Sequence, residues 1–196
     1  MVVKNTLAKF LCASVLSVLI CGSAMADGQE LNEMEYVGGD PDKGTRFPIE
    51  IFEMAKQLKT EKKYSQAEGL LLSNLEQARK AARGTDMLGK YLVRLNNIFF
   101  DQGNDTEAVK YGEVASKILT KNYYRSRDSI GWLVNVESYL AMSYSRLGKF
   151  DIAVKKYTEA ITLSEKAPKG KVSDSWIETL KAQRKKILQG TAKATK

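Results

Sequence analysis

The chain has 196 residues, with 31 basic and 23 acidic side chains and no histidine, so its formal net charge is +8. Both cysteines, Cys12 and Cys21, lie near the amino terminus. This composition excludes histidine general bases, serine–histidine relays and most zinc, copper or haem sites, and it confines cysteine chemistry to the first 21 residues. The sequence also contains no glycine-rich phosphate loop and no calcium loop. We therefore expect a protein that is not an enzyme and that requires no metal or cofactor.

The first 26 residues have the layout of a secretory signal peptide. Lys4 and Lys9, with no acidic residue, precede an apolar run over residues 10–21, and Ala24-Met25-Ala26 supplies the small residues that signal peptidase reads. The run is too short to cross a bilayer, which takes about 20 apolar residues. Cleavage would leave a chain without cysteine, which favours a periplasmic or secreted protein of a bacterial envelope. The alternative is an amphipathic or membrane-anchoring first helix.

Residues 27–46 are expected to form a flexible acidic leader. Residues 27–42 contain six acidic side chains and no basic one, and Gly38-Gly39-Asp40-Pro41 is a turn signal. From Lys166 to the end, by contrast, there are nine basic residues and two acidic ones. One hypothesis is therefore that the leader contacts the basic tail, within one chain or in a neighbouring chain.

From Phe47 onward, apolar residues recur at helical spacing and no segment alternates as a strand does. Breaks at 62–63, 84–85, 103–104, 125–128, 148–149 and 168–172 leave seven expected helices. Pro48 suits a first helical turn, Gly190 is expected to end the last helix, and residues 191–196 are expected to form a disordered basic tail. The expected helix caps are Thr85, Asp105, Asp128 and Ser173.

An internal repeat runs through these helices. In three stretches a leucine or aromatic residue is followed by a turn and, nine positions after it, by an alanine. The small alanine allows two antiparallel helices to cross closely, and glycine allows the chain to turn between them. The residues expected to carry the repeat are Ala67, Phe99, Gly103, Ala108, Ala115, Tyr144, Gly148, Ala153, Tyr157 and Ala160.

These residues resemble the motif of the tetratricopeptide repeat family, most closely over residues 140–160. The middle unit departs from the motif at Asn96 and Gly112, and the first unit departs at Lys62 and Asn74. The alanines are 41 and 45 residues apart, longer than the common unit of about 34, which is similar to the long repeats of kinesin light chains.

The resemblance implies an all-α fold over residues 47–190. We expect a right-handed superhelical stack of about three antiparallel helix pairs, closed by a C-terminal capping helix over residues 173–188. The buried stripe of that helix is expected to contain Trp176, Ile177, Leu180, Ile187 and Leu188. A plain helical bundle and another kind of helix-pair repeat are the alternatives.

The resemblance also implies that the first helix of each pair lines a concave groove that binds a protein or peptide. The groove is expected to be polar and mildly basic, which favours an acidic peptide or a free carboxylate. Phe52 stands where the carboxylate clamp of some family members needs lysine, so that clamp is not expected. The expected groove residues are Phe52, Lys56, Lys59, Lys90, Arg94, Asn97, Asp101, Asn135, Ser138, Met142 and Arg146.

Two other functions remain open at this point. A basic surface on the last helix would suit an anionic membrane surface or another acidic polymer, although the same residues also suit a solvated capping helix. An enzyme that uses only carboxylates and lysines is the second alternative. Nucleic acid is not an expected partner, because export would separate the protein from it. The residues of the basic surface are Lys181, Arg184, Lys185 and Lys186.

Overall fold

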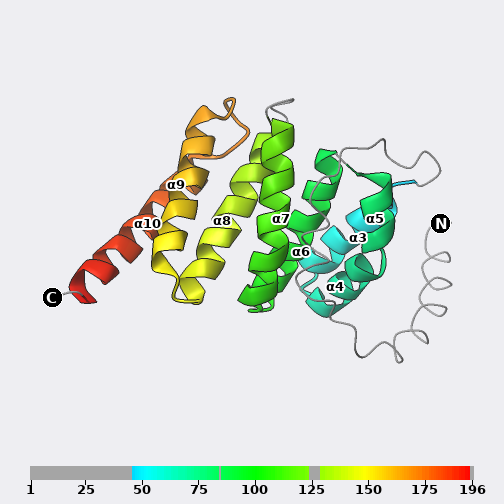
Figure 1. Ribbon diagram of the computed structural model, residues 1–196, viewed down its shortest axis with the longest axis horizontal. Coiled ribbons are helices and arrows are strands. Elements are labelled where there is room, and N and C mark those ends of the chain that lie inside the picture. The colour runs from blue at the N-terminus through cyan, green and yellow to red at the C-terminus, as the bar shows by residue number, and fades with distance from the viewer. Residues whose placement is uncertain (1–45, 84, 124–128, 195–196) are drawn as a thin grey trace. The chain divides into compact units, whose positions relative to one another are not determined.

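The computed structural model describes residues 46–83, 85–123 and 129–194, and this part of the chain is all-α (Figure 1). The proposed signal peptide, the leader up to residue 45 and Asp128 lie outside the described residues. None of the described helices is both long enough and apolar enough to cross a membrane. The described helices are α3 (Ile49–Thr60), α4 (Tyr64–Ser73), α5 (Leu75–Ala81), α6 (Asp86–Asp101), α7 (Asp105–Tyr123), α8 (Ile130–Arg146), α9 (Phe150–Lys166) and α10 (Asp174–Ala194).

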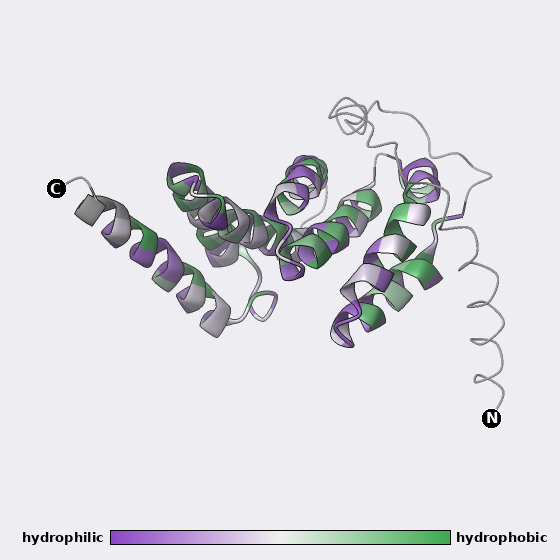
Figure 2. Cartoon of the chain, turned by 90° about the horizontal axis from the view of Figure 1, so that it is seen from below, coloured by the Kyte–Doolittle hydropathy of each residue, from purple (hydrophilic) through white to green (hydrophobic). Residues whose placement is uncertain are grey.

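The helices pack as consecutive antiparallel pairs, as the repeat predicts. The pairs are α3 with α4, α6 with α7 and α8 with α9, and α10 packs against α9 (Figure 1). Between pairs, α6 contacts α3, α4 and α8, and α7 contacts α8. The helices carry hydrophobic and hydrophilic stripes (Figure 2), and the hydrophobic side chains form one core cluster from α3 to α9 and a smaller one among α8, α9 and α10.

The three pairs turn with the same backbone geometry. Gly103 and Gly148 have positive φ angles of 78° and 73°, and Lys62 adopts a φ of 59° at the equivalent place. In each turn the following N–H donates to a carbonyl five residues earlier, on Leu58, Phe99 and Tyr144 respectively. This is the Schellman pattern that closes a helix. The first turn therefore keeps the repeat geometry although a lysine replaces the glycine.

Several expected boundaries differ from the structure. The expected helix over residues 64–83 divides at Asn74, whose Nδ2 donates to the Leu70 carbonyl at 2.9 Å, so the described part has eight helices rather than seven. Asn104, not Asp105, accepts the N–H of Glu107 at the start of α7. Ser173 does cap α10.

Two further expectations about helix ends need correction. The Thr85 side chain makes no cap hydrogen bond to α6; its hydroxyl donates backwards to the Ala82 carbonyl at 2.8 Å. Gly190 does not end the last helix, because α10 continues to Ala194 and includes part of the expected tail. Within its expected stripe, Leu180 is buried but Leu188 is 49% exposed.

The alanines of the repeat lie on the second helix of each pair and are fully buried, at Ala67, Ala108 and Ala153. Ala108 lies against α6, because Asn96 Nδ2 donates to its carbonyl at 2.7 Å. The remaining repeat residues are also buried or lie in the turns: Phe99, Ala115, Tyr144, Tyr157 and Ala160 are buried, and Gly103 and Gly148 form turns.

The two departures of the middle unit from the motif are spatial partners. A Cβ atom added at Gly112 of α7 would lie 2.7 Å from Asn96 Nδ2 of α6 and 2.8 Å from Leu140 Cδ2 of α8. Asn96 is larger than the small residue usual at its position, and Gly112 is smaller than the usual aromatic. The two changes in size therefore offset each other at the α6–α7 contact.

We predict that Gly112→Ala destabilises the protein by about 1–3 kcal/mol, because the added methyl group overpacks this contact. Asn96→Ala in the same chain should reduce that loss. Gly69→Ala in α4 is the matched control, since nothing lies within 4 Å of the added Cβ, and it should stabilise by up to about 1 kcal/mol. Urea unfolding of the four chains gives the comparison. Equal effects at Gly69 and Gly112 would contradict the packing assignment.

Candidate functional site

One stripe of α6 faces the first helices of both neighbouring pairs. Lys90, Arg94, Asn97 and Asp101 recur every three or four residues, so they share one side of the helix. Asp101 pairs with Lys59 of α3, with Oδ2 and Nζ 2.6 Å apart, and Asn97 Nδ2 donates to Asn135 Oδ1 of α8 at 3.0 Å. We call this surface the α3–α6–α8 face.

Arg94 lies on this face against two neighbouring aromatic rings. Its guanidinium carbon is 3.9 Å from the ring centroid of Phe52 and 5.9 Å from that of Trp132. Only 9% of the residue is exposed. The flat, weakly hydrated guanidinium group suits such a position, because it stacks on aromatic faces.

Arg94 has no hydrogen bond or ion pair within the described part of the chain, and its Nε is buried without an acceptor. Burial lowers the pKa of Arg94, which the charge of Glu53 partly offsets, but a guanidinium stays protonated at neutral pH. A buried charge without a partner is costly, and buried polar groups are normally hydrogen-bonded. Arg94 is therefore a strong candidate for contact with a ligand.

A second polar atom on the same stripe also lacks a partner. Asn97 Oδ1 is buried and accepts no hydrogen bond in the described part of the chain. Arg94 thus offers an unused N–H donor, and Asn97, three residues later, offers an unused carbonyl acceptor. A peptide carries both complementary groups, in a carboxylate and a backbone N–H.

The other cations of the expected groove have acidic partners. Lys90 Nζ lies 2.6 Å from Asp86 Oδ2, which also accepts the hydroxyl of Ser129 at 2.5 Å. Arg146 lies over the Phe100 ring and 3.6 Å from Asp105 Oδ1. Lys56 is exposed and has a looser contact of 3.9 Å with Glu53. Arg94 differs from all of these because no carboxylate of the described residues pairs with it.

Two expected groove residues lie elsewhere, and a third is buried within the site. Ser138 is fully buried, and its hydroxyl donates to the Val134 carbonyl at 2.6 Å, so it does not line an open surface. Met142 packs on the cluster formed with α9 and α10 rather than on α6. Phe52 is only 5% exposed, and it serves as the platform beneath Arg94.

Sequence reasoning missed Trp132 and Tyr139, which flank Asn135 on α8. Trp132 packs on Phe52 with ring centroids 6.2 Å apart, and Tyr139 packs edge-on against Phe100 at 5.0 Å. Trp132 is three residues before Asn135 and Tyr139 is four residues after it. Residues at this spacing share one side of a helix, so the sequence could have placed both on the α3–α6–α8 face.

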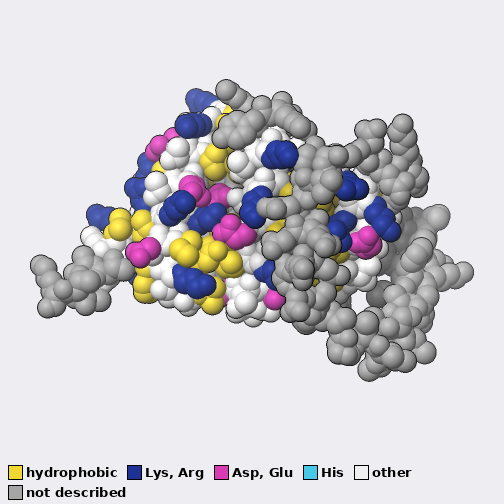
Figure 3. Space-filling model, viewed as in Figure 1, with side chains coloured by type: hydrophobic (Ala, Val, Ile, Leu, Met, Phe, Trp, Pro, Cys, Tyr) yellow, Lys and Arg dark blue, Asp and Glu magenta, His cyan; other side chains and the backbone are white. Residues whose placement is uncertain are grey.

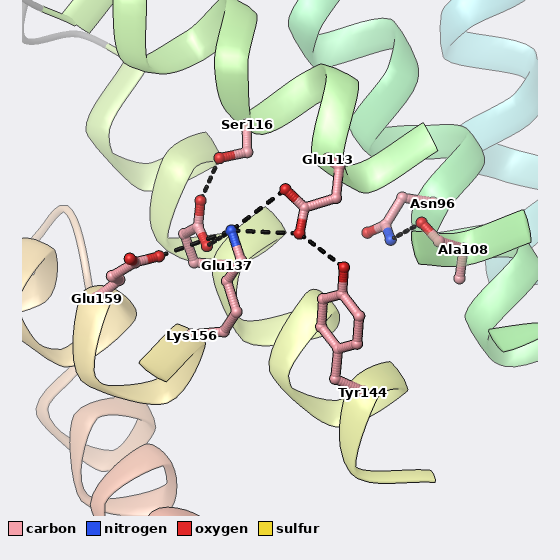
Figure 4. Close-up of polar contacts among 8 residues, drawn as sticks. All are labelled: Asn96, Ala108, Glu113, Ser116, Glu137, Tyr144, Lys156 and Glu159. Atoms are coloured by element: carbon pink, nitrogen blue, oxygen red, sulfur yellow. Dashed lines mark hydrogen bonds and ion pairs between the residues drawn. The ribbon is translucent and has the colours of Figure 1, made fainter. Parts of the chain in front are cut away.

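A pocket of about 1170 Å³ opens on another part of the molecule, between α7 and α9 with α8 beneath. Basic and acidic side chains lie close together over this region (Figure 3). At its floor, Lys156 Nζ lies 3.1 Å from Glu137 Oε2, 3.4 Å from Glu113 and 3.6 Å from Glu159 (Figure 4). Ser116 donates to Glu137.

The charged groups of this cluster pair with one another, although Glu137 Oε2 contacts Lys156 as an ion pair and accepts no hydrogen bond in the described part of the chain. Burial raises the pKa of Glu137, and Lys156 and Ser116 offset part of that rise. Burial alone would lower the pKa of Lys156, but Glu137 and Glu113 outweigh it and raise that pKa. The cluster joins α7, α8 and α9 through mutual contacts, so we interpret it as a structural bridge between the second and third helix pairs.

The basic surface on α10 is partly neutralised. Lys181 Nζ lies 3.2 Å from Glu178 and 3.7 Å from Glu165, and Arg184 donates to the Thr158 hydroxyl at 3.3 Å. Lys185 and Lys186 are exposed. No group of three or more acidic, histidine or cysteine side chains in the described ranges is placed to hold a metal ion.

The fold and these sites define an all-α protein of consecutive helix pairs with a polar face around an unpaired arginine. No protein-family model matches the chain, and no curated protein or solved structure is significantly similar to it.

We predict that Lys156→Met destabilises the protein by about 3 kcal/mol at pH 8, because it leaves the buried Glu137 carboxylate without its cation. Lys156→Met combined with Glu137→Gln should lose much less. The loss should also shrink at pH 5. A carboxyl whose pKa is raised by folding binds its proton more tightly in the folded state, so stability rises as the pH falls toward the pKa of the unfolded carboxyl. Chemical unfolding at both pH values measures this, and equal losses in the single and double variants would contradict it.

Proposed function

We propose that this protein is an interaction adaptor of the tetratricopeptide type, and that it binds an acidic segment or free carboxylate of another protein on the α3–α6–α8 face. The observation that carries the proposal is the Arg94 guanidinium, which lies on the Phe52 ring near Trp132 and has no acidic partner in the described part of the chain. A carboxylate fits the planar guanidinium through two parallel hydrogen bonds. Such a bond would satisfy the donor that the fold leaves unused.

The arrangement around Arg94 favours a protein ligand over a small anion. The neighbouring rings of Phe52 and Trp132 offer apolar contact, and Asn97 and Asn135 offer amide groups that suit a peptide backbone. Arginine and aromatic residues are enriched among the residues that dominate binding energy at protein interfaces. The proposed export of the chain would place this partner in the periplasm or outside the cell.

The alternative site, the basic surface on α10, has weaker support. Two of its four cations already contact Glu165, Glu178 or Thr158, so less of its charge is available to an anionic membrane surface. The proposal therefore assigns binding to the Arg94 site and a solvated capping role to α10.

We predict that Arg94→Met reduces capture of the partner more than tenfold, because Met fills the space over Phe52 but cannot bond a carboxylate. Crosslinking in the exported compartment followed by affinity purification and mass spectrometry would identify the partner. Binding of the purified partner would then be measured at low and high salt, since a charge-dependent contact weakens as salt rises.

Lys185→Glu combined with Lys186→Glu is the control, because it changes charge on α10 and leaves Arg94 intact. The pair should keep partner binding within about twofold. Partner binding that survives Arg94→Met but is lost in the α10 pair would overturn the proposal and favour the basic surface.

A further inference from the structure

The described chain begins at the Arg94 site. The Phe47 ring packs edge-on against Tyr91, with centroids 6.0 Å apart, and against Phe52 at 6.3 Å. Phe52 is the ring on which Arg94 lies. The Arg46 carbonyl is also fixed, because it accepts a hydrogen bond from Gln77 Nε2 at 2.9 Å. Whatever precedes residue 46 therefore joins the folded part next to the unpaired guanidinium.

The segment that precedes residue 46 carries negative charge, which could pair with the Arg94 guanidinium. Residues 27–42 carry six carboxylates and no cation. Asp42 and Asp40 are five and seven residues before Phe47, and an extended chain spans up to about 3.3–3.6 Å per residue. Both carboxylates are therefore within reach of the Arg94 guanidinium, because Arg94 lies on the Phe52 ring and that ring packs against Phe47.

We propose that Asp40 and Asp42 of the acidic segment occupy the Arg94 site of their own chain until a partner displaces them. This inference rests on the proposed function, since it assigns a competitor to the same site. A short tether gives an effective concentration on the order of millimolar, so even a contact with a Kd of about 0.1 mM would be mostly formed. The partner's apparent affinity would fall about tenfold, in proportion to the fraction of open sites.

The basic surface on α10 is a less suitable place for the acidic segment. α10 contacts α9, whereas α3, which follows the segment directly, contacts α4 and α6. Lys181 and Arg184 also have contacts already, as described above. The unpaired charge of Arg94 and the position of the segment directly before α3 therefore favour the Arg94 site over the basic surface on α10.

The test uses a fluorescent synthetic peptide of residues 27–45 as the probe and the otherwise complete protein as the receptor. One receptor is the wild type. A second, the amide variant, has Asn or Gln in place of the acids Asp27, Glu30, Glu33, Glu35, Asp40 and Asp42. Fluorescence anisotropy should show that the peptide binds the amide variant about tenfold more tightly than the wild type, because the variant's own segment no longer competes.

Arg94→Met in the amide variant should abolish peptide binding, and Arg94→Lys should weaken it, since lysine keeps the charge but loses the paired hydrogen bonds. Circular dichroism checks that both remain helical. Because Trp132 and Trp176 are the tryptophans of the chain, Trp176→Phe leaves Trp132 as the reporter of the site. In that background the emission of Trp132 should change when the six acids are replaced, and should change back on addition of the peptide.

Equal peptide affinity for the wild type and the amide variant would overturn the inference. So would peptide binding that survives Arg94→Met but is lost with Lys185→Glu and Lys186→Glu, because the tail would then be the site. Wild-type dimers that dissociate in the amide variant would overturn occupation within one chain. If the peptide does not bind but partner capture still depends on Arg94, the inference falls and the proposed function stands. If neither depends on Arg94, both fall.

Discussion

The close crossing of paired helices is the constraint on which the rest of this structure depends. Ala67, Ala108 and Ala153 are completely buried on the second helix of each pair, each five residues after a turn of the same Schellman geometry. A side chain no larger than a methyl group at these positions permits the close approach. The pairing in turn decides which face of each first helix remains for its neighbours. In the middle pair, the larger Asn96 and the smaller Gly112 together fill the space at this contact.

The Arg94 site follows from this pairing. Because one side of α6 packs on α7, its opposite stripe lies between α3 and α8, where the guanidinium contacts Phe52 and lies near Trp132. Interior charges elsewhere in the described chain have partners, as Lys156 has in Glu137. The contrast between a cluster whose charges form ion pairs and an arginine without an ion pair in the described chain is our ground for separating a structural role from a binding role. Residues that serve binding often reduce stability, whereas structural residues increase it.

The sequence predicted the helix pairs, the turns and the small residues because these depend on local spacing and on backbone conformation. It also placed Arg94 and Asn97 on one face of a helix. It could not predict which residues that face would meet, because helical spacing does not determine how neighbouring helices cross. For that reason Ser138 and Met142 were assigned to the groove, Trp132 was missed, and the absence of a partner for Arg94 became visible only in three dimensions.

The free energy of unfolding of Arg94→Met tests most directly whether the fold holds Arg94 for a ligand. Replacement of an unpaired buried charge by an apolar side chain of similar length removes a desolvation cost, although it also removes the contact with the Phe52 ring. When the six acids Asp27, Glu30, Glu33, Glu35, Asp40 and Asp42 are also replaced by amides, so that no contact with the acidic segment is lost, the account predicts that Arg94→Met is at least as stable as its parent in urea unfolding. A loss of about 2 kcal/mol or more would show that Arg94 stabilises the fold itself, and would contradict its assignment as a binding residue.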